Sequence, residues 1–268
     1  QTAANNKKNI KDLTFIGFIG LKDPLRKEAK QAIDACREAG IKLIIVTGDH
    51  ALTVKAIARE LDMKISSENI VTGQELEKMS DKELRKRLKN IKIYARVEPQ
   101  HKLRVIEAWQ KKGEVVAMTG DGINDTPALK KADIGIALGS GTDIAKEVSD
   151  LVLLDDNFNI IVEAVREGRV IIDNMRKIIT YLLSDVSTEL ILIFGALAAG
   201  FPLPILPAQI LWTNLIEDGL PGIALGFEPK EEDVMKRKPE KHDVPLLTSE
   251  MKALIFIIGL VNDFILLG

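Results

Sequence analysis

Two carboxylates in a short glycine-rich turn, Asp121 and Asp125, are the residues of this sequence best placed to do chemistry. They lie in the segment Thr-Gly-Asp-Gly-Ile-Asn-Asp at 119–125, which also carries Asn124 and follows a predicted strand at 114–118. A strand end that presents such oxygens can hold Mg²⁺ through one carboxylate while the others orient its waters. The alternative interpretation is a turn that is rich in Asp, Asn and Gly for purely local reasons.

Two more polar motifs also follow predicted strands. Thr47, Gly48 and Asp49 come directly after an apolar strand at 41–46, where a threonine hydroxyl and glycine amides can bind phosphoryl oxygens. Lys102, at the start of a predicted helix, can supply positive charge to a phosphoryl group and to an attacked carboxylate. Each motif alone is typical of a turn or of a solvated helix start, whereas the three in this order form a specific combination.

The elements that position these motifs alternate along the first half of the chain. Segments rich in Ile and Val alternate with amphipathic segments, which predicts an α/β fold with a parallel sheet and helices on both of its faces. In such sheets the chemistry lies at the carboxyl ends of the strands. Strands are predicted at 13–19, 41–46, 92–95, 114–118 and 134–137, and helices at 26–39, 52–61, 81–88, 101–111 and 127–131.

The second half of the chain has the composition of membrane helices. Residues 178–229 contain no lysine or arginine, and the apolar segments 178–200 and 205–225 are each long enough to cross about 30 Å of hydrocarbon. We therefore predict a transmembrane hairpin, and the basic residues that flank it place both outer ends and the soluble half in the cytoplasm. The predicted divisions are a cytoplasmic α/β domain at 1–165, a stalk at 166–177, two transmembrane helices at 178–226, a cytoplasmic loop at 227–252 and the start of a third span at 253–268.

The charges inside the two predicted spans are all acidic. Carboxylates in a segment of this kind are costly and mark an ion pathway by default. Asp185 and Glu189 share one helical face, although Asp185 can instead be read as solvated at the membrane interface. Gly219 and Pro221 are expected to break or unwind the second helix and to release backbone carbonyls. The oxygen ligands of a predicted site for a hard cation are Glu189, Asn214, Glu217 and Asp218.

The composition excludes several other functions. A net charge of −2 and an aromatic content of 4% give no reason to expect nucleic-acid binding. The single cysteine, Cys36, rules out an internal disulfide framework, and three scattered histidines offer no zinc cluster. His50 and His101 are expected to be surface neighbours of the motifs.

The order of these motifs resembles the phosphorylation domain of P-type ATPases, in the haloacid-dehalogenase-like superfamily. Segment 119–137 matches the family's hinge signature almost throughout, and Asp-Pro-Leu-Arg at 23–26 is similar to the family's Asp-Pro-Pro-Arg. The resemblance runs from about residue 13 to the end and is strongest to the calcium-pump-like type II branch. It implies use of ATP and Mg²⁺. The implied roles are phosphoryl contacts for Thr47, Gly48 and Asp49, charge neutralisation for Lys102, Mg²⁺ binding for Asp121, and orientation of the phosphate and the metal's surroundings for Asn124 and Asp125.

The resemblance also extends to the predicted cation site. Glu189, Asn214 and Asp218 match the Glu, Asn and Asp of the fifth and sixth spans of type II calcium pumps. Glu217 stands where those pumps have Thr, and Val186 stands where an Asn ligand is usual, so one of two calcium sites is missing or rebuilt. The resemblance favours Ca²⁺ and leaves Mg²⁺, Na⁺ and H⁺ open. It implies a multi-pass membrane protein in contact with lipid, expected in the plasma membrane.

One part of the family pattern is missing from these 268 residues. The family nucleophile is the Asp of an Asp-Lys-Thr-Gly-Thr string, which does not occur here, and no nucleotide-binding domain is recognisable. We therefore expect a piece of a pump that is inactive alone and that works with a missing N-terminal part of the same pump. One alternative is a haloacid-dehalogenase-like phosphatase fused to a membrane anchor, for which Asp12 and Asp23 are poorly placed nucleophiles. Another is a non-catalytic membrane adaptor, which does not account for the spacing of the intramembrane carboxylates.

Overall fold

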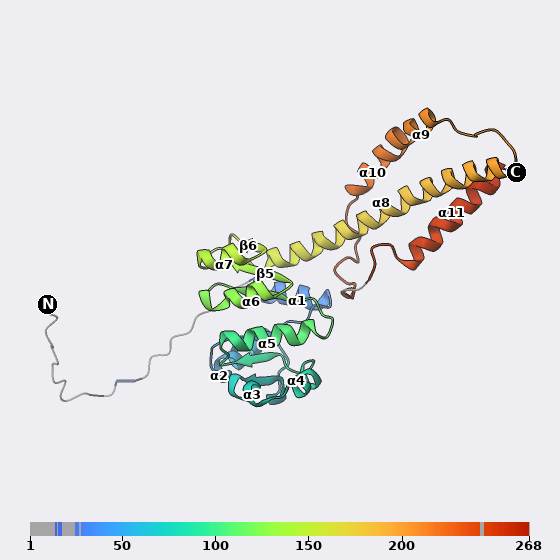
Figure 1. The fold of residues 1–268 in the computed structure, drawn as a ribbon. Coiled ribbons are helices and arrows are strands. Elements are labelled where there is room, and N and C mark those ends of the chain that lie inside the picture. The colour runs from blue at the N-terminus through green and yellow to red at the C-terminus, as the bar shows by residue number, and fades with distance from the viewer. Residues whose placement is uncertain (1–13, 15, 18–24, 27, 242–243, 268) are drawn as a thin grey trace.

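The structure is a computed structural model that describes residues 14, 16–17, 25–26, 28–241 and 244–267. Figure 1 shows an α/β body from which one long helix, α8 (Asn159–Ala198), extends. The helices that follow α8 in the sequence lie beside it. Of the strand predicted at 13–19, only three residues are described, and none of these is in a strand.

The first sheet is parallel and has the order β1-β3-β2, with β1 (Ile45–Val46), β2 (Ile70–Thr72) and β3 (Ile93–Ala95). Successive side chains of the buried strand β3 point to opposite faces: Tyr94 joins one apolar cluster, and Ile93 joins the other. Helices on both faces supply these clusters, as the sequence predicted. They are α1 (Ala29–Glu38) and α2 (Ala51–Glu60) on one face, and α3 (Gly73–Lys78), α4 (Asp81–Arg87) and α5 (Pro99–Gln110) on the other.

The second sheet is also parallel and has the order β4-β5-β6. Leu129 and Ala145 pack on Ala137 of the central strand, whereas Leu151 and Val152 stay partly exposed. Ile136 and Leu153 point to the other face from Ala137 and are also buried, so both faces of this sheet are covered. The elements are β4 (Ala117–Gly120), β5 (Ile134–Leu138), β6 (Leu151–Leu153), α6 (Thr126–Lys131) and α7 (Asp143–Val148).

The prediction of one continuous sheet was wrong for the described residues. β1 and β4 each form the edge of a separate three-stranded sheet, and they are not paired with each other. Parallel strands belong to one sheet only when their backbones are hydrogen-bonded, and apolar periodicity says nothing about which strands pair. β2, β6 and α7 were not predicted because they are too short to show a period, and the helix predicted at 81–88 is preceded by the separate helix α3.

The first apolar helix is longer than predicted. α8 is one helix of 40 residues, so the stalk predicted at 166–177 and the first span are continuous. At 1.5 Å per residue such a helix is about 60 Å long, twice the hydrocarbon thickness of a bilayer. Among the described residues, it is the one helix that is long and apolar enough to cross a membrane.

The second apolar segment contains α9 (Pro207–Thr213), a π-helical turn (Asn214–Asp218) and α10 (Gly219–Gly226). The helix is not broken at Gly219 and Pro221, but it widens into the π-helical turn directly before them, so the prediction that it breaks or unwinds holds in part. Pro221 has no N–H to bond the carbonyl of residue 217 four positions earlier. The Tyr181 hydroxyl of α8 donates to that carbonyl of Glu217 instead, at 2.8 Å.

The last helix, α11 (Ser249–Leu267), begins four residues before the third span predicted at 253–268. Thr248 stabilises its first turn, because the Thr248 hydroxyl accepts a hydrogen bond from the Met251 amide at 3.2 Å. α11 packs against α8. In Figure 1, α11 lies on the opposite side of α8 from α9 and α10.

Arg169 joins α8 to the segment between α10 and α11 and to the α/β body. Its guanidinium donates to the carbonyls of Val234 at 2.8 Å, Arg237 at 2.9 Å and Ala39 at 2.8 Å. Ala39 and Val234 are buried. Gly40, which follows Ala39, has a φ of +77°. A Cβ at Gly40 would lie 2.7 Å from Cδ of Pro239, so the two segments approach closely there. The end of α1, α8 and this segment therefore meet at one junction.

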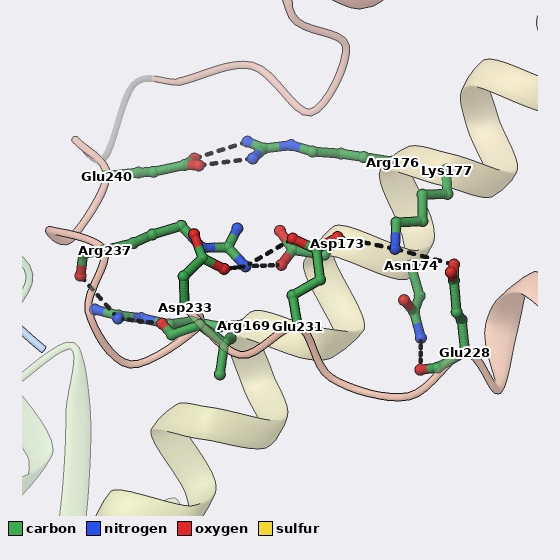
Figure 2. A network of polar contacts seen from close by, with 11 residues as sticks. Arg169, Asp173, Asn174, Arg176, Lys177, Glu228, Glu231, Asp233, Arg237 and Glu240 are labelled. Carbon is green, nitrogen blue, oxygen red and sulfur yellow. Dashed lines mark hydrogen bonds and ion pairs between the residues drawn. The ribbon is translucent and has the colours of Figure 1, made fainter.

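Ion pairs extend this junction along α8 (Figure 2). Arg176 makes two hydrogen bonds to Glu240, of 2.6 and 2.7 Å, and these bonds lower the pKa of the Glu240 carboxyl. Asn174 donates to the carbonyl of Glu228 at 2.9 Å. The other pairs shown are Lys177 with Glu228 and Glu231, and Arg237 with Asp173, Glu231 and Asp233.

We expect the change Arg169→Ala to lower the free energy of unfolding by about 2–4 kcal/mol, because it removes a charged donor and leaves buried carbonyls unpaired. Unfolding of the full chain in lipid nanodiscs would measure this. Arg166→Ala is the matched control, since Arg166 lies three residues earlier and pairs with Glu163 on the helix surface. Equal effects of the two changes would contradict the junction.

Candidate functional site

The motif after β1 is held by the loop that follows β3. The Val97 amide donates to the Thr47 carbonyl at 3.1 Å, and the Arg96 amide donates to the Asp49 carbonyl at 3.0 Å. The Thr47 hydroxyl accepts from the Asp49 amide at 3.1 Å, so its own proton stays available for a ligand. Gly48 and Asp49 are exposed. This backbone is fixed while its surface is open to a phosphoryl group.

Lys102 and Asp125 form an ion pair that joins the two sheets. Lys102 lies in the first turn of α5, after the first sheet, and Asp125 follows β4 of the second sheet. Both side chains are largely buried, at 14% and 12% exposure, and buried charges are stable only when paired. Gly120 makes room for the pair, because a Cβ there would lie 2.6 Å from the Cβ of Asp125. The sequence predicted both residues, but not this contact.

Asp121 and Asn124 lie at the surface beyond β4. The loop after β5 holds the backbone of Asp121, because the Thr142 amide donates to its carbonyl at 2.8 Å. A Cβ on Gly141 would lie 2.9 Å from the same carbonyl, so this approach requires glycine. The Asp121 carboxylate therefore stands on a fixed backbone at the carboxyl end of a strand.

The chemistry of these donors fits Mg²⁺ better than a metal that needs several protein ligands. Among the described residues, no three His, Cys, Asp or Glu side chains come together closely enough to hold a metal ion. Mg²⁺ commonly takes one or two carboxylates and completes its shell with waters and substrate phosphates. A single exposed carboxylate at Asp121 is compatible with that mode of binding.

Only some residues of the predicted cation site lie close to one another. Asp218 is buried and interacts electrostatically with Asp185 and Glu189 of α8. Asn214 and Glu217 are exposed on the π-helical turn. The structure thus places Asp218 beside α8 and does not bring the four predicted ligands around one point.

Sequence reasoning missed two functional candidates. Tyr181, whose hydroxyl binds the Glu217 carbonyl, lies four residues before Asp185, and that spacing on one helical face was the available signal. His101 was expected at the surface, yet it is 5% exposed. Its burial has no signature in the sequence, because it depends on how α3 packs against α5. His50 is exposed as expected, and its ring accepts a hydrogen bond from Leu52 at the start of α2.

Family profiles match both halves of the chain. A haloacid dehalogenase-like hydrolase profile matches residues 1–133, and a second profile of the same description matches 102–165. A profile of the C-terminus of cation transporting ATPases matches residues 202–268. The chain also resembles the crystal structure of a zinc-transporting PIB-type ATPase in its E2.Pi state, with a TM-score of 0.51, 27% identity, and coverage of 76% of this chain and 27% of that one.

Curated relatives are more similar in sequence. A calcium-transporting ATPase of Bacillus subtilis is 51% identical over 230 residues, which are 85% of this chain and 26% of the relative. The endoplasmic reticulum-type calcium-transporting ATPase 4 of Arabidopsis thaliana is 47% identical over 254 residues, which are 93% of this chain and 24% of the relative. The chain thus spans about a quarter of the length of these relatives. With hydrolase and cation-ATPase profiles on its two halves and such relatives along most of its length, the chain belongs to the P-type cation-transporting ATPases, a family of enzymes.

Proposed function

We propose that this chain forms part of an ATP-driven pump in which an aspartyl phosphate drives the transport of a hard cation, with Ca²⁺ as the cargo. The continuity of α8 is the observation that carries this proposal. α8 is one unbroken helix that packs against α1 of the α/β body. Its second half is apolar and carries Glu189. A continuous helix of this kind can transmit a movement at the phosphoryl site to the carboxylates of the predicted cation site.

The cytoplasmic residues would act by binding and electrostatics. The Thr47 hydroxyl and the Gly48 amide would donate to phosphoryl oxygens. Lys102, with Asn124 nearby in the motif after β4, would stabilise negative charge that develops during transfer, and Asp121 would hold Mg²⁺. Bound Mg²⁺ supplies charge stabilisation for phosphoryl transfer from ATP. Asp125 would keep the Lys102 ammonium in place, as their ion pair suggests.

The arrangement of the last helices supports a multi-pass membrane protein. Large apolar side chains are exposed along α8 to α11, among them Phe194, Leu211, Leu220 and Phe256. Such a surface suits lipid rather than water. We infer that α9 and α10 form the second arm of a hairpin and that α11 begins a third span. The plasma membrane stays a prediction, because the relatives include endoplasmic reticulum-type pumps.

A chimeric pump, in which the 268 residues replace the matching segment of the Bacillus subtilis relative, would test the proposal. We expect ATP-dependent Ca²⁺ uptake into proteoliposomes and an acid-stable phosphoenzyme that requires Ca²⁺. Parallel assays with Mg²⁺, with Na⁺ and across pH would distinguish the other cargoes. Phosphoenzyme formation from inorganic phosphate checks that the chimera is folded. A folded chimera without any cation-dependent phosphoenzyme would contradict the proposal.

A further inference from the structure

An unusual hydrogen bond lies at the N-terminus of α5. Glu98 is the N-cap residue and His101 is the third residue of the helix. The Glu98 amide donates to Nδ1 of His101 at 3.0 Å, and the His101 amide donates to the backbone carbonyl of Glu98 at 2.9 Å. The imidazole thus takes the place of the Glu or Gln side chain of a capping box, which accepts from the amide of the N-cap residue. Because Nδ1 accepts, the ring is neutral and carries its proton on Nε2.

The imidazole fills a closed slot between α3 and α5. His101 is 5% exposed, and its Nε2 lies 3.2 Å from a carboxylate oxygen of Glu77 on α3. Its Cε1 would be 3.3 Å from a Cβ at Gly73, where a Cβ would also lie 2.3 Å from the Arg96 carbonyl. The glycine at position 73 therefore lets α3 approach both the ring and the loop at Arg96 closely.

The capping box lies between two predicted phosphoryl motifs. Its N-terminal side continues the loop whose Arg96 and Val97 amides hold Thr47 and Asp49. Its C-terminal side continues into Lys102, whose largely buried side chain reaches Asp125. The backbone position of Lys102 therefore depends on the first turn of α5.

We infer that His101 is a positioning residue of the phosphoryl site: its neutral imidazole fixes the first turn of α5 and so holds Lys102 against Asp125. This inference rests on the proposed function. A side chain without an acceptor at this position would leave the Glu98 amide without the partner that Nδ1 provides.

Variants of the full chain separate capping from packing. His101→Gln keeps an acceptor for the Glu98 amide, whereas His101→Leu removes the acceptor. Gln100→Ala is the matched control, because Gln100 is an exposed residue of the same turn that bonds only to the Glu98 side chain. In amide hydrogen exchange of the 268-residue protein, we expect faster exchange at residues 98–103 in His101→Leu alone.

The same variants in the chimeric pump test the consequence for the site. We expect His101→Leu to raise the concentration of inorganic phosphate needed for half-maximal phosphoenzyme about tenfold, which is the size of effect that a lost helix cap gives. His101→Gln and Gln100→Ala should stay within about twofold of the parent.

The outcomes distinguish this inference from the proposed function. If Lys102→Met abolishes phosphoenzyme while His101→Leu matches the parent, the positioning role of His101 is overturned and the proposed site stands. If His101→Gln is as impaired as His101→Leu, the imidazole does not act through its cap. If Lys102→Met has no effect, the proposed site itself is wrong. If His101→Leu does not fold, the phosphate dependence of His101→Gln decides, and an impaired His101→Gln overturns the positioning role.

Discussion

Asp121→Asn in the chimeric pump should lower the rate of phosphoenzyme formation from ATP by about 100- to 1,000-fold. The change removes the charge that holds Mg²⁺, and a bound metal contributes several kcal/mol of charge stabilisation in phosphoryl transfer. The fold should be unaffected, because the carboxylate is exposed and the backbone carbonyl of Asp121, not its side chain, bonds to Thr142. Rapid-quench measurement of acid-stable phosphoenzyme across a Mg²⁺ titration gives the effect.

A control for this change is available in the same domain. Asp143 is a fully exposed carboxylate in the first turn of α7, so Asp143→Asn changes the net charge equally without touching the predicted metal. We expect Asp143→Asn to behave like the parent at every Mg²⁺ concentration. Normal phosphorylation of Asp121→Asn at low Mg²⁺ would show that the metal is bound elsewhere.

Glu189→Gln and Asp218→Asn should each abolish Ca²⁺-stimulated phosphorylation from ATP in the chimeric pump. Phosphorylation from inorganic phosphate should persist, because the cytoplasmic residues are untouched. An unpaired carboxylate in hydrocarbon costs several kcal/mol unless it shares a cation or takes up a proton. Asp218 is buried, and its carboxylate repels that of Glu189 on the facing helix. A bound cation would reduce this repulsion.

Glu217 separates the two chemistries that remain open at this site. It is exposed on the π-helical turn, where the type II calcium pumps that the sequence resembles have threonine. Comparing Glu217→Thr with the parent across titrations of Ca²⁺, Mg²⁺, Na⁺ and pH distinguishes a divalent ligand from a proton carrier. Glu167→Gln, an exposed change near the start of α8, serves as the control. Unchanged cation dependence in both Glu189→Gln and Asp218→Asn would rule out the predicted cation site.

Local patterns in the sequence determined much of the α/β body. Apolar segments bounded by turn residues predicted β3, β5 and most of the helices around them, because period and length are properties of consecutive residues. The same reasoning placed Thr47, Lys102 and Asp121 after strands, as the structure has them. The long apolar segment that became the second half of α8 was equally visible, since membrane character depends on composition alone.

Tertiary structure decided which of these local elements act together. The separation into two sheets, the Lys102–Asp125 pair between them and the junction at Arg169 all join residues far apart in the chain. The burial of His101 depends on α3, which the sequence pattern did not reveal as a separate helix. Hydrophobic period and turn chemistry act over a few residues, whereas strand pairing, buried ion pairs and helix packing are chosen by the free energy of the whole fold.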